Sequence, residues 1–467
     1  MGQPGPRYAR LSRADVSNLR LESRASPFHI GGLAVVEAAP LLDGSGHLRL
    51  EEIADRLNRR LARVPQLRRR VHSGGPFTGR PIWVDDDRFE ISTHLHELAV
   101  PPPGGELELL DAAARAFAGL IDRRGALWEL WFLTGVGGDR MGVLFKLHHA
   151  MADGVAAVAM MRSLLDARAD VPEPVPEPWA PRPPPHPGWI RRDAVAAAAR
   201  SLSRCARDLS DPLPALRAGE ALAREAGRAL LQERAPRTSL NFRVGPGRRV
   251  RWLPIDLRSV REVARSAGAA INDVVLAVYS EGLRELLTSR GEPVDHVVLR
   301  TSVPVSLRPG HRSEDLGNRV SLIVVPLPLG EAGLRRRLAL IADAGAKARS
   351  RAPAPIQAAF GSLATPLVQH LITRQRVVNV FSTNVAGPPH PLYLLGAQVL
   401  AMLPIVQIAG NVGISLCTIA YAGVAHLVVT ADAAGFPDVD VLMRGMERGW
   451  GDLARRPVPR ELPRSPG

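Results

Sequence analysis

A proline-rich segment limits what this chain can fold into. Residues 172–187 contain nine prolines. Proline lacks a backbone N–H donor and fixes φ, so a segment of this density cannot continue a helix or a central strand and adopts an extended conformation. At 467 residues the chain is also longer than one hydrophobic core usually supports. We therefore predict two domains joined by a Pro-rich linker at residues 171–189.

Strand-like and helix-like patterns alternate on both sides of this linker. Runs of β-branched residues and period-two alternation indicate strands, while apolar residues at intervals of three and four indicate helices. In the N-terminal half we expect strands at 30–37, 130–134 and 140–147, and helices at 50–64, 107–121 and 155–165. In the C-terminal half we expect strands at 248–256, 297–305, 322–329, 377–384, 397–401, 413–420 and 424–431, and helices at 257–267 and 272–287.

These patterns predict an α/β fold with two lobes. The N-terminal lobe is expected to span residues 1–170 and the C-terminal lobe residues 237–467. Between the linker and the second lobe, residues 190–236 are rich in Ala, Arg and Leu and are expected to form a helical crossover. We favour a helix on the protein surface over the alternative, a basic amphipathic helix that rests on a membrane.

One long stretch of the second half carries no charge. Residues 377–431 contain no Asp, Glu, Lys or Arg. Polar amides and several Pro and Gly interrupt the stretch, so we predict a buried sheet rather than a transmembrane helix. An apolar substrate channel is compatible with the same sheet. The N-terminal residues lack the apolar core of a signal peptide, and two cysteines in so long a chain fit a reducing cytosol.

The formal net charge of +14 comes almost entirely from arginine, because Lys146 and Lys347 are the only lysines. The surface is therefore either simply solvated or attracts anionic lipid headgroups or the phosphates of a nucleotide-bearing substrate. Aromatic residues make up only 4% of the chain. Nucleic-acid binding is disfavoured, since single-strand binders interleave basic and stacking residues.

The motif that carries chemistry is His148-His149-Ala150-Met151-Ala152-Asp153-Gly154. It lies where the predicted strand 140–147 meets the predicted helix 155–165. Side chains alternate across a strand, so the two histidines point to opposite faces and do not share a metal ion. The residues alone leave open which histidine acts. Gly154 permits a tight turn into the helix.

A histidine at this position suits acyl transfer from a thioester. An imidazole can take a proton from an attacking hydroxyl and return it to the departing sulfur, and the activated thioester needs no covalent acyl-enzyme. Nearby N–H groups would stabilise the oxyanion. A serine hydrolase is disfavoured because the chain contains no Gly-x-Ser-x-Gly sequence.

A second acyltransferase signature also fits part of the motif. His148 and Asp153 satisfy the His-x4-Asp spacing of membrane glycerolipid acyltransferases. That family adds a Pro-Glu-Gly-Thr-like block that binds the phosphate of its acceptor, and the chain has no such block. We therefore discount this family.

Further blocks narrow the class, and they span nearly the whole chain. Four blocks of the chain match sequence blocks of one family. They are Leu127-Trp128-Glu129, the Asn-Asp pair within residues 271–277, Val303 to Arg308 with Gly317 to Arg319, and Asn384 to Pro389. In these blocks the chain resembles the bacterial wax ester synthase/acyl-CoA:diacylglycerol acyltransferase family, within the superfamily of condensation domains and chloramphenicol acetyltransferase. Two departures are Ala126 and Ala386, each of which stands where the family has proline.

The resemblance implies a fold and a role for each motif residue. It implies two chloramphenicol-acetyltransferase-like lobes with a central channel at their interface. It also implies that His149 is the general base, that His148 packs behind it, and that Asp153 faces away from substrate and holds the loop. An Arg pairs with that Asp in the superfamily, and Arg308 is our candidate.

The other matched blocks supply further candidate site residues. Asn272 is either an amide donor near the reaction centre or a helix N-cap. Trp128 is more typical of a core residue than of a substrate contact. Asn384 and Gly387 are expected to shape a loop at the channel.

The resemblance implies an enzyme that moves a long acyl chain from acyl-CoA, as co-substrate, to diacylglycerol, a fatty alcohol or both. No bound cofactor or metal is expected, and the partners are these substrates with peripheral contact to a membrane or lipid droplet from the cytoplasm. Two alternatives stay open, namely a condensation-type enzyme with a carrier-bound donor and a catalytically silent lipid-binding protein. Acceptor, acyl length and oligomeric state are not encoded in these motifs.

Overall fold

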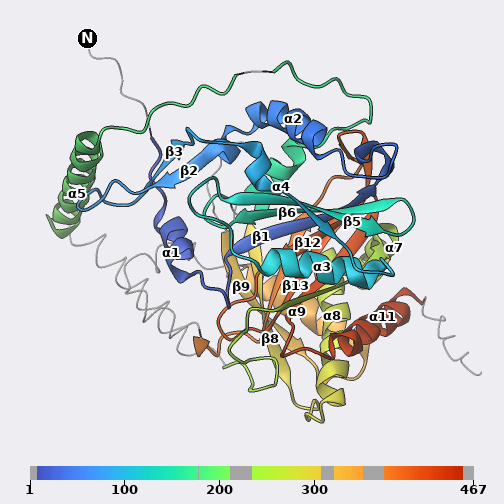
Figure 1. Cartoon of the computed structure of the whole chain (residues 1–467). Coiled ribbons are helices and arrows are strands. Elements are labelled where there is room, and N and C mark those ends of the chain that lie inside the picture. Colours follow the sequence, from blue (N-terminus) through green and yellow to red (C-terminus); the bar gives the residue numbers. More distant parts are fainter. Residues whose placement is uncertain are drawn as a thin grey trace, which may run out of the picture.

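The computed structural model describes residues 8–152, 154–176, 178–210, 234–306, 320–350 and 373–455. They form two six-stranded sheets, each with its own helices, in two lobes that lie one above the other (Figure 1). A separate two-stranded hairpin is made of β2 (Arg69–His72) and β3 (Ile82–Asp85). The prediction of an α/β fold with two lobes is confirmed.

The first sheet has the order β11-β12-β1-β6-β5-β4. Its strands are β1 (His29–Glu37), β4 (Leu95–Ala99), β5 (Trp128–Val136), β6 (Arg140–His148), β11 (Tyr393–Leu394) and β12 (Ala397–Val406). The helices that accompany it are α1 (Arg13–Leu21), α2 (Leu50–Arg60), α3 (Glu106–Ala118) and α4 (Gly154–Ser163). Residues 141–148 of β6 are all buried, as expected of a strand in the middle of a sheet.

The second sheet has the order β7-β14-β13-β10-β8-β9. Its strands are β7 (Arg248–Asp256), β8 (Val298–Ser306), β9 (Val320–Pro328), β10 (Val380–Ala386), β13 (Ile414–Tyr421) and β14 (Val424–Asp432). Its helices are α7 (Leu257–Ser266), α8 (Ile271–Ser289), α9 (Leu334–Ser350) and α11 (Val439–Ala454). Apolar side chains of these helices and strands form one core.

The two sheets do not divide the chain at a single point. β12 belongs to the second half of the sequence but pairs antiparallel with β1, where Ile30 lies opposite Val406. The predicted boundary at residue 237 missed this exchange, because a pairing between strands so distant in sequence leaves no local pattern. This pairing matters for the site, because β1 lies between β12, from the second half of the sequence, and β6, which carries the His motif.

Two glycines allow α3 to lie close to the first sheet. A Cβ on Gly31 of β1 would be 2.8 Å from the Phe117 ring, and one on Gly142 of β6 would be 2.5 Å from Cδ1 of Leu109. Both distances are shorter than packed carbon atoms allow. Glycine at these positions therefore sets the distance between α3 and the strand that leads to the His motif.

The Pro-rich segment is held against the first lobe rather than free. Glu173 accepts hydrogen bonds from Arg56 and Arg60, both at 2.9 Å. Further along, the Trp179 indole N–H donates to the Asp86 carbonyl at 3.0 Å. The segment ends where α5 (Pro187–Ser210) begins. The absence of helix and strand from the described residues of this segment agrees with the prediction, and the contacts of Glu173 and Trp179 hold the segment against the surface of the first lobe.

The charge-free stretch forms strands rather than a transmembrane helix, as predicted, but these strands are divided between the two sheets: β11 and β12 belong to the first and β10, β13 and β14 to the second. β13 and β14 are buried along nearly their whole length. No helix in the described part of the chain is long and apolar enough to cross a membrane.

One buried histidine in this sheet gives the fold a pH dependence. His426 is 3% exposed, stacks on Trp252, and has no hydrogen-bond partner for either ring nitrogen among the described residues. Burial lowers its pKa to about 4 from an ordinary value of 6.5. Between these values the unfolded chain binds a proton that the folded chain does not. Stability is therefore lost as the pH falls through this window, by up to about 3 kcal/mol.

The substitution His426→Phe keeps a ring of similar size and removes the titration. We expect a smaller fall in melting temperature between neutral pH and pH about 4.5 than in the unsubstituted protein. The melting temperature of the variant should still fall somewhat at low pH, because burial also lowers the pKa of other histidines such as His29. An unchanged pH dependence of the melting temperature would contradict this role of His426.

Candidate active site

The His motif lies at the carboxyl end of β6, where the chain turns toward α4. His148 is the last residue of β6 and lies opposite His29 of β1 in the strand pairing. His148 is fully buried, whereas His149 is partly exposed. The adjacent side chains therefore have different surroundings, and of the two only the His149 side chain has access to solvent.

Backbone contacts fix the position of His149. Its N–H donates to the Phe28 carbonyl at 2.8 Å, and its carbonyl accepts from the Asn18 amide at 3.4 Å. Asn18 belongs to α1, and Phe28 directly precedes β1. The start of the chain thus holds the turn in place from outside the motif.

His148 supports the same turn with its side chain. Its Nδ1 accepts the Ala150 N–H at 2.9 Å, and its carbonyl accepts the Met151 N–H at 2.9 Å. Because Nδ1 is an acceptor, the neutral ring carries its proton on Nε2. That nitrogen lies 3.4 Å from Oε1 of Glu22.

Glu22 is a buried carboxylate that the sequence reasoning did not identify as functional. Its side chain is 1% exposed, and Oε1 lies 3.0 Å from Nε2 of His29. Oε1 also accepts the Phe28 N–H at 3.2 Å, and Oε2 accepts from Arg123 at 3.0 Å. Burial alone would raise the Glu22 pKa, but His148, His29 and Arg123 together hold it well below its usual range. An ionised carboxylate therefore connects the end of α1 with β1 and with His148 at the end of β6.

Lys146 extends this polar cluster along β6. It is fully buried two residues before His148, and its Nζ donates to Glu129 at 2.8 Å and to the Ala116 carbonyl at 3.2 Å. The face of β6 toward α3 is thus polar near the motif. The opposite face, with Phe145 and Leu147, belongs to the apolar core.

The candidate Trp128 lies in the core of the first lobe. It is 1% exposed, and its indole N–H donates to the Leu67 carbonyl at 2.7 Å. The His94 ring stacks on it at 4.6 Å, while His94 Nδ1 donates to the Trp128 carbonyl at 2.9 Å. Trp128 is therefore a core residue whose ring is held in place by the Leu67 carbonyl and the His94 ring, as the sequence favoured.

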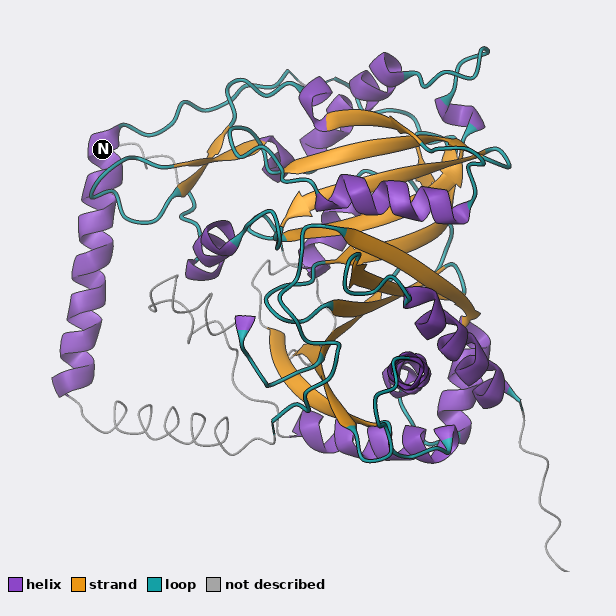
Figure 2. Ribbon diagram, turned by 60° about the horizontal axis from the view of Figure 1, so that its bottom comes forward, coloured by secondary structure: helices purple, strands orange, loops and turns teal. Residues whose placement is uncertain are grey.

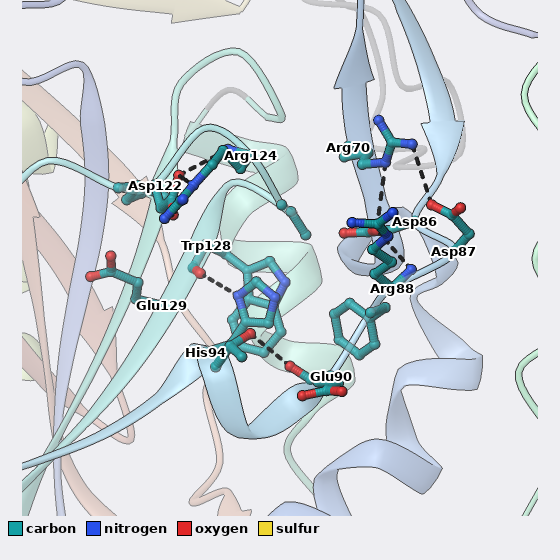
Figure 3. Close-up of a pocket in the computed structure, with 15 residues that line it drawn as sticks. Arg70, Asp86, Asp87, Arg88, Glu90, His94, Asp122, Arg124, Trp128 and Glu129 are labelled. Carbon is teal, nitrogen blue, oxygen red and sulfur yellow. Dashed lines mark hydrogen bonds and ion pairs between the residues drawn. The ribbon is translucent and has the colours of Figure 1, made fainter.

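A polar cavity of about 540 Å³ is lined in part by Trp128 (Figure 3). The loop with Asp122 and Arg124 borders it on one side, and Arg70 with Asp86 and Asp87 borders it on the other. Both signs of charge are present, and Arg70 and Arg124 are paired with these carboxylates. Arg70 and Arg124 are therefore neutralised by neighbouring carboxylates rather than available to a phosphate group.

Asn272 is the second residue of α8 and is partly buried. The N-cap of this helix is Ala270, whose N–H donates to the Asp273 carboxylate at 3.0 Å. The interpretation of Asn272 as an N-cap is therefore wrong. Its side-chain amide makes no hydrogen bond to the part of the chain that the structure describes.

The remaining candidates lie at the second sheet or outside the described residues. Asn384 is exposed within β10, opposite Thr418 of β13. Gly387 follows β10, and a Cβ there would lie 2.2 Å from the Ala420 carbonyl oxygen, so only glycine fits. Asp153 and Arg308 lie outside the described residues. Their pairing stays a prediction.

Comparison with known proteins defines the class of this fold. The chain is similar to the starter condensation domain of rhizomide synthetase solved with C8-CoA, with 13% identity, a TM-score of 0.55 and coverage of 96% of this chain and 94% of that one. It is also similar to the wax ester synthase/diacylglycerol acyltransferase from Marinobacter aquaeolei VT8, with 24% identity, a TM-score of 0.69 and coverage of 95% and 98%. These structures share its two-lobed architecture.

Sequence comparison narrows the class to one family. The model of the wax ester synthase/diacylglycerol acyltransferase catalytic domain matches residues 11–275, and that of the C-terminal domain matches residues 316–453. The probable diacylglycerol O-acyltransferase tgs1 of Mycobacterium tuberculosis is 31% identical over 94% of each chain, and tgs2 of the same organism is 29% identical over 93% and 96%. The chain belongs to the wax ester synthase/diacylglycerol acyltransferase family. It is an acyltransferase.

Proposed function

We propose that this enzyme moves a long-chain acyl group from acyl-CoA to the hydroxyl of diacylglycerol, of a fatty alcohol, or of both. The names of the relatives support these acceptors, and the structure solved with C8-CoA supports the donor. We further propose peripheral contact with the lipid in which such acceptors dissolve.

The observation that carries the mechanism is the separation of the two histidines. His148 is fully buried and lies against Ala150 and Glu22, whereas His149 is partly exposed. In the proposed reaction, the acceptor oxygen attacks the thioester carbon while His149 takes its proton. The C–S bond then breaks, and the imidazolium returns the proton to the CoA thiolate. No bond between enzyme and acyl group is needed.

One assay of the purified full chain tests this function. Palmitoyl-CoA is supplied with either diacylglycerol or hexadecanol, and the products are separated by thin-layer chromatography. We expect triacylglycerol, wax ester or both. If ester forms only when the acyl donor is an acyl-carrier protein, the enzyme is of the condensation type. If no ester forms with either kind of donor while lipid still binds, the protein is a silent lipid binder.

Asn272 and its neighbour Asp273 offer a matched pair of substitutions. We propose that the Asn272 amide stabilises the oxyanion or positions a substrate, so Asn272→Ala should lower kcat by about 10²-fold without changing the melting temperature. Asp273→Ala removes a buried carboxylate that accepts the Ala270 N–H, so it should lower the melting temperature. Rates are measured well below both melting temperatures. A fall in stability and an unchanged rate for Asn272→Ala would contradict the proposed role.

A further inference from the structure

The β2–β3 hairpin and α5 pack against each other. A Cβ on Gly79, in the loop of the hairpin, would lie 3.3 Å from the Cβ of Ala194 in α5. A Cβ on Gly74 of the same loop would lie 3.1 Å from Cδ1 of Ile190. The loop and the first half of α5 are thus one packed unit. Figures 1 and 2 show that α5 stands away from both sheets.

The loop of this hairpin holds an aromatic ring in solvent. Phe77 is 91% exposed and has a φ of 63°, a left-handed conformation that is costly for a residue with a Cβ. The surrounding backbone is fixed, because the Thr78 hydroxyl donates to the Gly75 carbonyl at 2.6 Å and Arg10 donates to the Thr78 carbonyl at 2.8 Å. The fold therefore maintains a strained turn whose apolar ring contributes nothing to its own core.

α5 adds exposed apolar side chains next to the stripe that contacts the hairpin. Val195 is 67% exposed and Leu202 is 71% exposed. They are seven residues apart and so lie on one face of the helix, two turns from each other. Arg191 is four residues before Val195 and lies on the same face. This face is apolar and basic, and it contacts neither sheet.

The charge of this region is positive. Arg80, Arg191 and Arg192 are exposed, and no acidic side chain among the described residues pairs with any of them. The nearby Asp193 is already paired with Arg10 at 2.6 Å. The region therefore complements a negatively charged surface.

We propose that this projecting surface docks the protein onto an anionic lipid surface. We define it as Phe77, Val195 and Leu202 together with Arg80, Arg191 and Arg192. Protein interfaces exclude charge from their apolar centre. Here arginine lies beside apolar side chains, as in segments that rest among lipid headgroups. The inference rests on the proposed function only in that the acceptors of that function dissolve in such lipid.

Vesicle flotation of the full chain tests the proposal. The vesicles contain phosphatidylcholine alone or with phosphatidylglycerol, at low and at high salt. We expect binding to the anionic vesicles that salt weakens. Phe77→Gly should lower the affinity about tenfold without lowering the melting temperature, because glycine relieves the strained φ. The double substitution Val195→Ser with Leu202→Ser should act similarly, and Arg191→Gln with Arg192→Gln should remove the preference for anionic vesicles.

Leu107→Ser is the matched control, because Leu107 of α3 is 51% exposed and lies outside the projecting surface. It should bind vesicles like the unsubstituted protein. The proposal is overturned if the unsubstituted chain does not bind vesicles, or if the Phe77 and α5 variants bind as well as it does. The His149→Ala variant should still bind, and the surface variants should keep their rate with a detergent-dispersed alcohol. A failure of docking is thereby distinguished from a failure of the proposed function.

Discussion

Replacing His149 by alanine is expected to lower the rate of ester formation by about 10²- to 10⁴-fold. The substitution removes the imidazole that we propose accepts the hydroxyl proton. The fold should survive, because alanine keeps the two backbone contacts of residue 149, its N–H to Phe28 and its carbonyl to Asn18. The measurement is the initial rate with palmitoyl-CoA and an alcohol, together with the melting temperature.

Two control substitutions at other histidines distinguish the loss of the proposed base from the general effect of removing an imidazole ring. His47→Ala changes a side chain that is 82% exposed, so it should alter neither rate nor stability. His148→Ala removes the acceptor of the Ala150 N–H from a fully buried position, so it should lower the melting temperature. Full turnover by a folded His149→Ala enzyme would disprove the assignment of the base.

Glu22→Leu is expected to destabilise the protein by about 3–5 kcal/mol. The side chain is almost fully buried, and its loss leaves the Phe28 N–H and the Arg123 guanidinium without this acceptor. The rings of His29 and His148 lose the same carboxylate. Chemical denaturation gives the free energy of unfolding directly.

Glu22→Gln keeps the shape and removes the charge, so its loss of stability should be smaller than that of Glu22→Leu. It should still lower the rate by about ten- to hundredfold if the carboxylate orients the turn that carries His149. Glu51→Gln is the control, because Glu51 is exposed in the first turn of α2. Equal stability of the Glu22 and Glu51 variants would show that the buried cluster does not hold the turn.

The acid sensitivity of Glu22 follows from the sign of its pKa shift. A carboxylate whose pKa is lowered in the folded state stabilises the protein fully above the unfolded pKa, and that contribution is lost progressively as the pH falls from the unfolded to the folded value. Because the Glu22 pKa lies well below its usual range, its contribution should be constant between about pH 5 and 8. The pH dependence in mildly acidic solution belongs instead to buried histidines such as His426.

The individual strands and helices were largely predictable because each carries its own period. The strand expected at 248–256 is β7 with the same bounds, and the helix expected at 272–287 is α8 with small extensions. The position of β12 in the first sheet was not predictable. A pairing of Ile30 with Val406 depends on tertiary contacts that local periodicity does not encode.

The same limit applies to the site. The spacing of His148 and His149 at a strand end was visible in the sequence, since alternation separates their side chains. Glu22 and His29 were missed, because burial is what distinguishes Glu22 from any solvated glutamate, and burial is set by α1, β1 and β6 together. The sequence left Asn272 open between an amide donor and an N-cap, and the N-cap alternative is wrong because α8 begins one residue before it.

The dependence of CoA release on the acceptor tests the central claim most directly. Free thiol and ester are measured in the same reaction of purified enzyme with palmitoyl-CoA, with and without a lipid alcohol. Base-assisted direct transfer predicts one thiol released for each ester formed, and no rapid release of thiol before the alcohol is added. A burst of thiol equal to the enzyme concentration without alcohol would reveal an acyl-enzyme and contradict the role proposed for His149.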